Sequence, residues 1–206
     1  MPKFAANLSM MFTELPFLER FGAAAAAGFP AVEFLFPYEH APEQIAAELR
    51  RHGLTQALFN MPPGDWAGGE RGLAALPERF EEVKAGVATA LTYAAATGCR
   101  RLHLMAGMRD PASAAARAAY VKAVRYAAEQ LAAQDIFLLL EPINGRNMPG
   151  YFLNDFTAAE ALIGELGLPN VKLQFDIYHR QILHGDVVKA IERVLPIIGH
   201  VQTASV

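Results

Sequence analysis

The sequence predicts an α/β fold of the (β/α)8 kind, the TIM barrel, and two observations carry this prediction. Short apolar runs alternate with helix-like segments along the chain of 206 residues, as they do in repeated βαβ units. An open doubly wound sheet binds ligands at a switch point and needs polar residues at the ends of only a couple of strands. Polar ends on many strands therefore favour a barrel, whose active site lies at the carboxyl ends of its strands. At least five of the apolar runs end in a residue with a side-chain oxygen: Asn7, Asn60, Glu141, Asp176 and Gln202.

Each strand is predicted from a short run that is rich in apolar residues. Residues 136–140, for example, are Ile-Phe-Leu-Leu-Leu, and residues 171–175 are Val-Lys-Leu-Gln-Phe. The predicted strands lie near residues 3–7, 31–36, 55–60, 101–106, 136–141, 171–176 and 199–203.

Six helices are predicted between the strands, because apolar residues recur there at helical spacing. Thr13 and Asn154 are candidate N-caps of the first and fifth helices, and Pro42 opens the second. A glycine follows four of the six, as is common at helix ends. The predicted helices cover residues 13–27, 42–52, 80–97, 121–131, 154–166 and 186–195.

The predicted barrel is one domain, residues 1–206, and it lacks its last β/α unit. A complete barrel of this kind takes about 250 residues, whereas this chain stops just after its seventh predicted strand. Seven strands cannot close an eight-stranded barrel, so the first and seventh strands would present unpaired edges. We expect the natural protein to continue past Val206; the alternative is a truncated form that is stabilised by association, for example as a homo-oligomer.

The composition excludes several classes of protein. The chain is 53% hydrophobic and 19% charged, so it is not a disordered protein. Its net charge is −3 and it has no basic stripe, which argues against binding to nucleic acid. No apolar run is long enough to span a membrane, and the N-terminus does not resemble a signal peptide. With Cys99 as its one cysteine, the chain is expected to be cytoplasmic.

Glu141 and Asp176 are the strongest candidates for chemistry. A carboxylate in a polar loop usually caps a helix or pairs with a surface arginine. Glu141, however, directly follows an apolar run, so we expect it to be partly buried and to need a partner. A divalent cation shared with Asp176 would supply one, because hard cations prefer oxygen ligands. Gln202 is a weaker third candidate, since a buried amide often has only a structural role.

Two histidines lie near these carboxylates. His179 follows Asp176 by three residues and could hydrogen-bond a substrate oxygen or stabilise an enolate; the alternative is a loop histidine packed beneath Tyr178. His103, inside the fourth predicted strand, is interpreted as a core or near-site residue, not as a ligand.

The loop at residues 64–72 is a candidate lid. It contains several glycines, the only tryptophan, Trp66, and the neighbours Glu70 and Arg71. A mobile loop with an aromatic residue can cover a barrel site and exclude water. The alternative is a long surface turn in which Asp65 and Arg71 form a weak ion pair. The glycines do not form a phosphate-binding fingerprint.

The motifs FAANLSMMFTELPFLERFGAAAAAGFPAVEFLFPY (4–38), GDWAGGERG (64–72), LLLEPIN (138–144) and QFDIYH (174–179) resemble the hydroxypyruvate isomerase family. The related 2-oxo-tetronate isomerases share the N-terminal stretch almost as well. Both groups belong to the xylose-isomerase-like TIM barrels, so the resemblance implies that fold. It also implies a Mg²⁺ or Mn²⁺ ion held by four side chains, of which three map onto Glu141, Asp176 and Gln202. The fourth, a glutamate of the eighth strand that also transfers protons, has no counterpart in this chain.

The resemblance implies an isomerase that converts hydroxypyruvate into tartronate semialdehyde through an enediolate. Glu141 would transfer a proton and His179 would steady the enediolate oxygen. Substrate contacts are expected from Trp66, Glu70 and Arg71 of the loop and from Asn144 and His103. The alternatives are a 2-oxo-tetronate isomerase or related sugar isomerase or epimerase, a metal-dependent phosphodiesterase like endonuclease IV, and a catalytically impaired truncated barrel.

Overall fold

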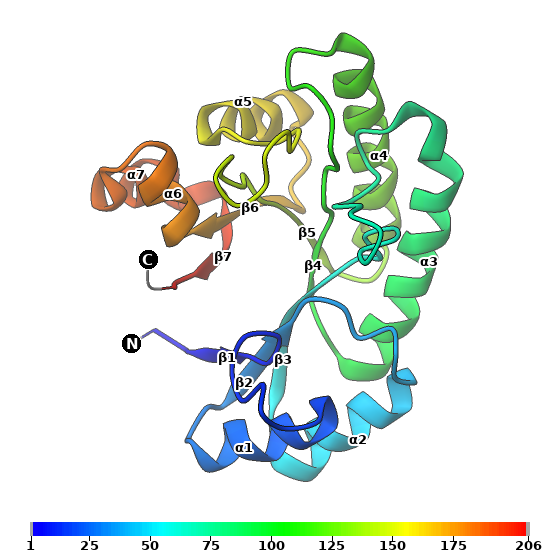
Figure 1. The fold of residues 1–206 in the computed structure, drawn as a ribbon, viewed down its shortest axis with the longest axis vertical. Helices are drawn as coiled ribbons and strands as arrows, with labels where there is room; N and C mark the ends of the chain where they lie inside the picture. The colour runs from blue at the N-terminus through cyan, green and yellow to red at the C-terminus, as the bar shows by residue number, and fades with distance from the viewer. Residues whose placement is uncertain (1, 205–206) are drawn as a thin grey trace.

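Seven parallel strands form one curved sheet with helices on its outer side (Figure 1). The computed structural model describes residues 2–204. The strands follow one another in sequence order, and every neighbouring pair is parallel. A doubly wound sheet would reverse its strand order, so this unbroken order confirms the predicted barrel class, here as an open arc. The strands are β1 (Ala5–Asn7), β2 (Ala31–Phe34), β3 (Thr55–Asn60), β4 (Arg101–His103), β5 (Phe137–Leu140), β6 (Val171–Asp176) and β7 (Ile198–Gln202).

The strand bounds match the sequence prediction closely. β3 and β6 have the predicted limits, and β4 differs most, because it ends at His103 and not at residue 106. Beyond β4 the chain leaves the sheet, and Ala106 forms an antiparallel bridge with Gly72 of the glycine-rich loop. This contact needs a glycine, since a Cβ atom on Gly72 would collide with the backbone of Met105. The loop is therefore packed directly against the end of β4.

The helices lie between the strands, as predicted, but two of their start signals were wrong. Thr13 does not cap the first helix, which begins with a 3-10 turn after Pro16. The N-cap of the fifth helix is Asp155 and not Asn154, because the Asp155 carboxylate accepts from the backbone N–H of Ala158 at 2.8 Å. The helices are η1 (Phe17–Glu19), α1 (Arg20–Ala26), α2 (Pro42–His52), η2 (Pro77–Arg79), α3 (Phe80–Thr97), α4 (Ala114–Ala132), α5 (Phe156–Leu166), α6 (Ile177–Leu183), α7 (Val187–Val194) and η3 (Leu195–Ile197).

One helix, α6, has no counterpart in the sequence prediction. It begins directly after β6, and the Asp176 side chain caps it by accepting from the backbone N–H of His179 at 2.8 Å. His179 therefore lies in the first turn of a helix and not in a loop. Its ring meets that of Tyr178 edge to face, with centroids 5.3 Å apart.

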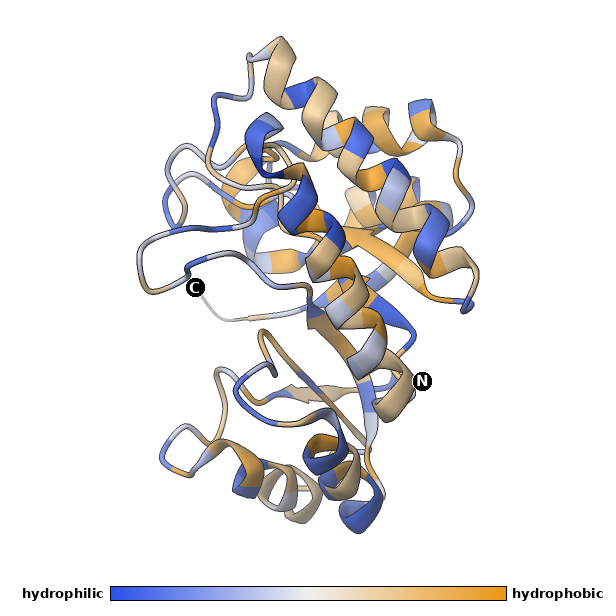
Figure 2. Ribbon diagram, turned by 90° about the vertical axis from the view of Figure 1, so that its right-hand side faces the viewer, coloured by the Kyte–Doolittle hydropathy of each residue, from blue (hydrophilic) through white to orange (hydrophobic). Residues whose placement is uncertain are grey.

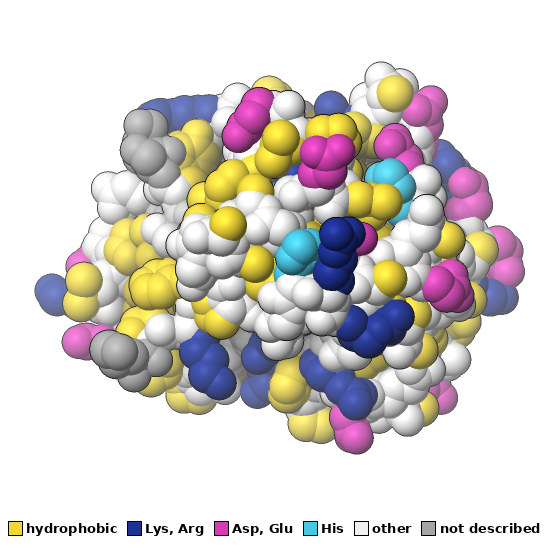
Figure 3. All heavy atoms as spheres, turned by 90° about the horizontal axis from the view of Figure 1, so that it is seen from below, with side chains coloured by type: hydrophobic (Ala, Val, Ile, Leu, Met, Phe, Trp, Pro, Cys, Tyr) yellow, Lys and Arg dark blue, Asp and Glu magenta, His cyan; other side chains and the backbone are white. Residues whose placement is uncertain are grey.

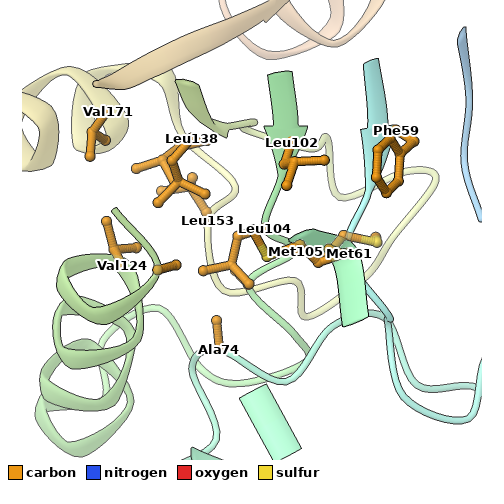
Figure 4. Packing of buried hydrophobic residues seen from close by; sticks show 14 of the residues in the cluster. Phe59, Met61, Ala74, Leu102, Leu104, Met105, Val124, Leu138, Leu153 and Val171 are labelled. Carbon is orange, nitrogen blue, oxygen red and sulfur yellow. The ribbon is translucent and has the colours of Figure 1, made fainter. Parts of the chain in front are cut away.

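The two faces of the sheet carry different chemistry because side chains alternate along each strand. On the outer face, apolar strand residues pack against the helices; Figure 4 shows Phe59, Leu102, Leu138 and Val171 of neighbouring strands in this cluster, with Val124 of α4 beside them. Figure 2 shows the corresponding mixture of hydrophobic and hydrophilic residues along the helices. The inner face is polar near the carboxyl ends of the strands: Asn7, Glu33, His103, Glu141, Gln174, Asp176, His200 and Gln202.

In the view of Figure 3, acidic, basic and hydrophobic side chains all reach the surface, and several Lys and Arg side chains lie in its lower half. Among residues 2–204, no helix is both long and apolar enough to cross a membrane. The outer strands of the sheet, β1 and β7, each pair with one neighbouring strand within the described residues.

Candidate active site

The two candidate carboxylates come together, as predicted. Glu141 directly follows β5, Asp176 ends β6, and these strands are neighbours in the sheet. Potential ligand atoms of Glu141, Asp176 and His179 all lie within 4.8 Å of one another. Glu141 is 7% exposed and Asp176 9% exposed, so both carboxylates are removed from solvent.

The electrostatics of this cluster fit a cation. Burial raises the pKa of Glu141 well above its usual value, and the neighbouring Asp176 carboxylate raises it further, while a hydrogen bond from Gln174 opposes the shift. Burial also raises the pKa of Asp176, against hydrogen bonds from the backbone N–H groups of His179 and Tyr178. Buried carboxylates at short range are costly to ionise together, and a bound cation would offset this cost. Oxygen ligands of this kind suit Mg²⁺ or Mn²⁺, so the residues form a possible divalent metal site.

His179 is held by Asn144, a residue of the loop that follows β5. The Asn144 side-chain nitrogen lies 2.6 Å from Nδ1 of His179. Asn144 is fully buried, whereas His179 is partly exposed. Burial lowers the pKa of His179 and the Asp176 carboxylate raises it, with burial the larger effect. The neutral imidazole is therefore favoured in this environment.

His103 is a buried residue whose ring lacks a hydrogen bond. It is 1% exposed, its Nδ1 lies 3.6 Å from a carboxylate oxygen of Glu141, and neither ring nitrogen has a hydrogen-bond partner among the described residues. Burial lowers its pKa to about 3, so the ring is neutral. A buried polar group without a partner is costly unless a ligand or water satisfies it, so this residue also fits a substrate-contacting role.

Gln202 lies at the end of β7 but is already engaged in hydrogen bonds. Its side-chain oxygen accepts from Gln174 at 2.7 Å, and its side-chain nitrogen donates to Glu33 at 2.6 Å. One lone pair of the Gln202 oxygen remains for a further partner. The role of Gln202 as a metal ligand therefore stays a prediction.

Glu33 is the residue that sequence reasoning missed. It lies within β2, is 6% exposed, and accepts hydrogen bonds from Asn7, His200 and Gln202. His200 and Gln202 therefore point toward the same side of β7. A glutamate inside the apolar run 31–36 was the available signal, since an acidic residue in a buried strand requires partners.

The glycine-rich loop is more ordered than a simple surface turn. The Trp66 ring packs on that of Phe36 with centroids 4.9 Å apart, and the Arg71 guanidinium lies 4.0 Å from the Trp66 centroid. Glu70 pairs with Arg79, which lowers the Glu70 pKa, and it also accepts from the backbone N–H of Asp65. The ion pair considered between Asp65 and Arg71 is not formed; Asp65 accepts instead from the backbone N–H of Gly68.

Comparison with known proteins identifies the family. Residues 21–206 match the family described as xylose isomerase-like TIM barrel. The 2-oxo-tetronate isomerase of Cupriavidus necator is 54% identical over 208 residues, an alignment that takes in 100% of this chain and 80% of that protein. The chain belongs to the hydroxypyruvate isomerase and 2-oxo-tetronate isomerase family.

Two further proteins are similar over the same span. Hydroxypyruvate isomerase of Escherichia coli is 44% identical over 99% of this chain and 80% of its own length. A crystal structure described as AP endonuclease, family 2, from Brucella melitensis matches with a TM-score of 0.98 and 52% identity, covering 100% of this chain and 80% of that one. The chain thus spans about four fifths of the length of these relatives.

Proposed function

We propose that this protein is a metal-assisted isomerase of 2-oxo-3-hydroxy acids, with 2-oxo-tetronate as its preferred substrate and hydroxypyruvate as the second. This order of substrate preference rests on sequence identity. The chain is 54% identical to the 2-oxo-tetronate isomerase of Cupriavidus necator and 44% identical to the hydroxypyruvate isomerase of Escherichia coli. This order reverses the preference drawn from the sequence motifs. Both substrates present the same reacting group, a carboxylate followed by a C2 carbonyl and a C3 hydroxyl.

The reaction is an internal redistribution of hydrogen that requires no external oxidant or reductant. A base removes the proton on C3, which gives an enediolate shared over C2 and C3. A proton is then returned to C2, while the hydroxyl proton passes from O3 to O2. The product is the 2-hydroxy-3-oxo acid, which for hydroxypyruvate is tartronate semialdehyde.

Glu141 is the proposed base and shares the metal site with Asp176 and Gln202. A Mg²⁺ or Mn²⁺ ion held there would polarise the carbonyl and hydroxyl oxygens of the substrate and lower the energy of the enediolate. The neutral His179 donates a hydrogen bond to a substrate oxygen, and His103 offers its unpaired nitrogens to the same region.

The substrate carboxylate is assigned to Arg71, whose guanidinium lies on Trp66 in the proposed lid, residues 64–72. Glu70 fixes this loop through Arg79. Replacing Glu70 by Gln should loosen the loop, raise KM and make Trp66 more accessible to acrylamide quenching. Because Trp66 is the only tryptophan, its fluorescence reports on the loop alone. Glu81→Gln, which breaks a comparable ion pair with Lys84 on α3, is the matched control.

The central experiment incubates the protein with each substrate and Mg²⁺ or Mn²⁺ in D2O and follows the C3 protons by NMR. Exchange above the metal-only control is expected, and Glu141→Gln should reduce it by about 100-fold or more while the fold is retained. Glu129→Gln, an exposed isosteric change on α4, should leave exchange unchanged. Exchange at wild-type rate in Glu141→Gln would overturn the assignment of the base.

Steady-state rates decide between the two substrates. A higher kcat/KM for 2-oxo-tetronate supports the proposed order, and a higher value for hydroxypyruvate restores the order that the motifs favoured. Cleavage of an abasic-site DNA duplex by the metal-loaded protein, with no exchange on either acid, would replace the isomerase by a phosphodiesterase.

A further inference from the structure

Asn144 makes three hydrogen bonds that define its orientation. Its side-chain oxygen accepts from the backbone N–H groups of Arg146 and Asn147 at 3.0 and 3.1 Å. Its side-chain nitrogen faces Nδ1 of His179 at 2.6 Å. A flipped amide would place its NH2 group against two backbone N–H donors and leave this side chain, which is 0% exposed, without those two hydrogen bonds. The amide is therefore fixed with its nitrogen toward the histidine.

This orientation also fixes the tautomer of His179. Because the amide nitrogen can only donate, Nδ1 of His179 has to accept, and the proton of the neutral ring resides on Nε2. The Nε2–H group is then a hydrogen-bond donor. A cation could bind Nε2 only if the proton moved to Nδ1, where it would face the NH2 group of Asn144 at 2.6 Å.

We propose that Asn144 is a positioning residue that holds His179 as the Nε2–H tautomer, so that His179 donates to a substrate oxygen and does not ligate the cation. The three groups within 4.8 Å then divide into two carboxylate ligands, Glu141 and Asp176, and one hydrogen-bond donor. The kinetic part of this inference rests on the proposed function; the tautomer and the ligand set do not.

The tautomer is measured directly by ¹⁵N NMR of protein labelled at histidine, with and without Mg²⁺. The chain has six histidines, so His179→Gln assigns the signal. The wild type should show a bare Nδ1 and a protonated Nε2 for His179, and Mg²⁺ should not change this pattern. A protonated Nδ1 in the wild type, or loss of the Nε2 proton on addition of Mg²⁺, would overturn the proposal without any measurement of activity.

A pair of variants tests the role of Asn144. In Asn144→Asp the carboxylate can still accept from both backbone N–H groups, but its other oxygen accepts from the ring, so the tautomer should reverse to Nδ1–H. Asn147→Asp adds the same charge three residues later, where the side chain accepts from Tyr178 at 2.9 Å, and should leave the tautomer unchanged. An unchanged tautomer in a folded Asn144→Asp protein would exclude the positioning role.

The ligand set and the catalytic consequence need two further measurements. Mn²⁺ affinity should fall at least about 10-fold in Glu141→Gln and remain close to wild type in His179→Gln. A loss of 10-fold or more in His179→Gln would make His179 a ligand and refute the inference. With active wild-type enzyme, Asn144→Asp should lower kcat by about 100-fold or more with little change in KM, as removal of a transition-state donor does. If the wild type converts neither substrate, the proposed function fails, while the NMR and affinity results still decide the inference.

Discussion

At the scale of single residues, the role proposed for Glu141 opposes the stability of the folded protein. Its pKa is raised in the folded protein above the ordinary value of 4.5, chiefly by burial. The folded state therefore gains from the protonated form below about pH 4.5, and loses this contribution as the pH rises toward the folded-state value. At neutral pH and without a metal ion, the folded protein must either bury the charge of the Glu141 carboxylate or keep that group protonated, and both cost free energy.

The first prediction follows from the upward direction of this pKa shift. In EDTA at pH 7, Glu141→Gln should be more stable than the wild type, by roughly 0.5–2 kcal/mol in urea unfolding, because an amide has no charge to bury. At pH 4.5 the difference should largely disappear. Mg²⁺ or Mn²⁺ should then stabilise the wild type and not the variant. A variant that is no more stable than the wild type at pH 7 would mean that protein groups already satisfy the Glu141 carboxylate.

At the scale of elements, the strands could be predicted from the sequence because their outward side chains form an almost continuous apolar pattern. Leu138 and Leu140 of β5, for example, pack against the helices while Glu141 follows them at the polar edge. The short helix α6 could not be predicted in this way, because its seven residues, which follow the candidate carboxylate Asp176, show too little periodicity. Glu33 was missed for a different reason: two of its partners, His200 and Gln202, lie 167 and 169 residues away in the sequence.

The start of α5 gives a prediction at this scale, because two adjacent residues both have the chemistry of an N-cap. The structure selects Asp155, so Asp155→Ala should cost about 1 kcal/mol in the free energy of unfolding. Asn154→Ala should have a much smaller effect. Asp155 also lies 2.8 Å from His184, and Asp155→Asn separates the two contributions by keeping a cap without a carboxylate. Equal losses in Asn154→Ala and Asp155→Ala would contradict the observed cap.

At the scale of the whole molecule, the curvature of the sheet brings residues that are distant in the sequence into contact. Glu33 of β2 joins His200 and Gln202 of β7, and Arg101 of β4 donates to the backbone oxygen of Gly199 at 2.9 Å. These contacts run across the inner face and connect strands that are not neighbours in the sheet. Polar bonds across the concave side therefore support the curvature of the open arc, while the apolar cluster joins the sheet to its helices.

The last prediction concerns the two edge strands of the open sheet, β1 and β7. β1 and β7 each have one neighbouring strand among residues 2–204, and exposed apolar side chains lie beside them, Phe4 at 59% and Val201 at 45% exposed. Unpaired strand edges with apolar side chains promote association, and a lysine on an edge strand opposes it. We expect the apparent molar mass of the 206-residue chain, measured by light scattering, to rise with concentration, and Val201→Lys to reduce this rise. Val188→Lys is the matched control, since Val188 is 69% exposed but lies on the helix α7 and not on a strand. An equal reduction in both variants would assign the association to general surface hydrophobicity, and a reduction confined to Val201→Lys would assign it to the open edge of the sheet.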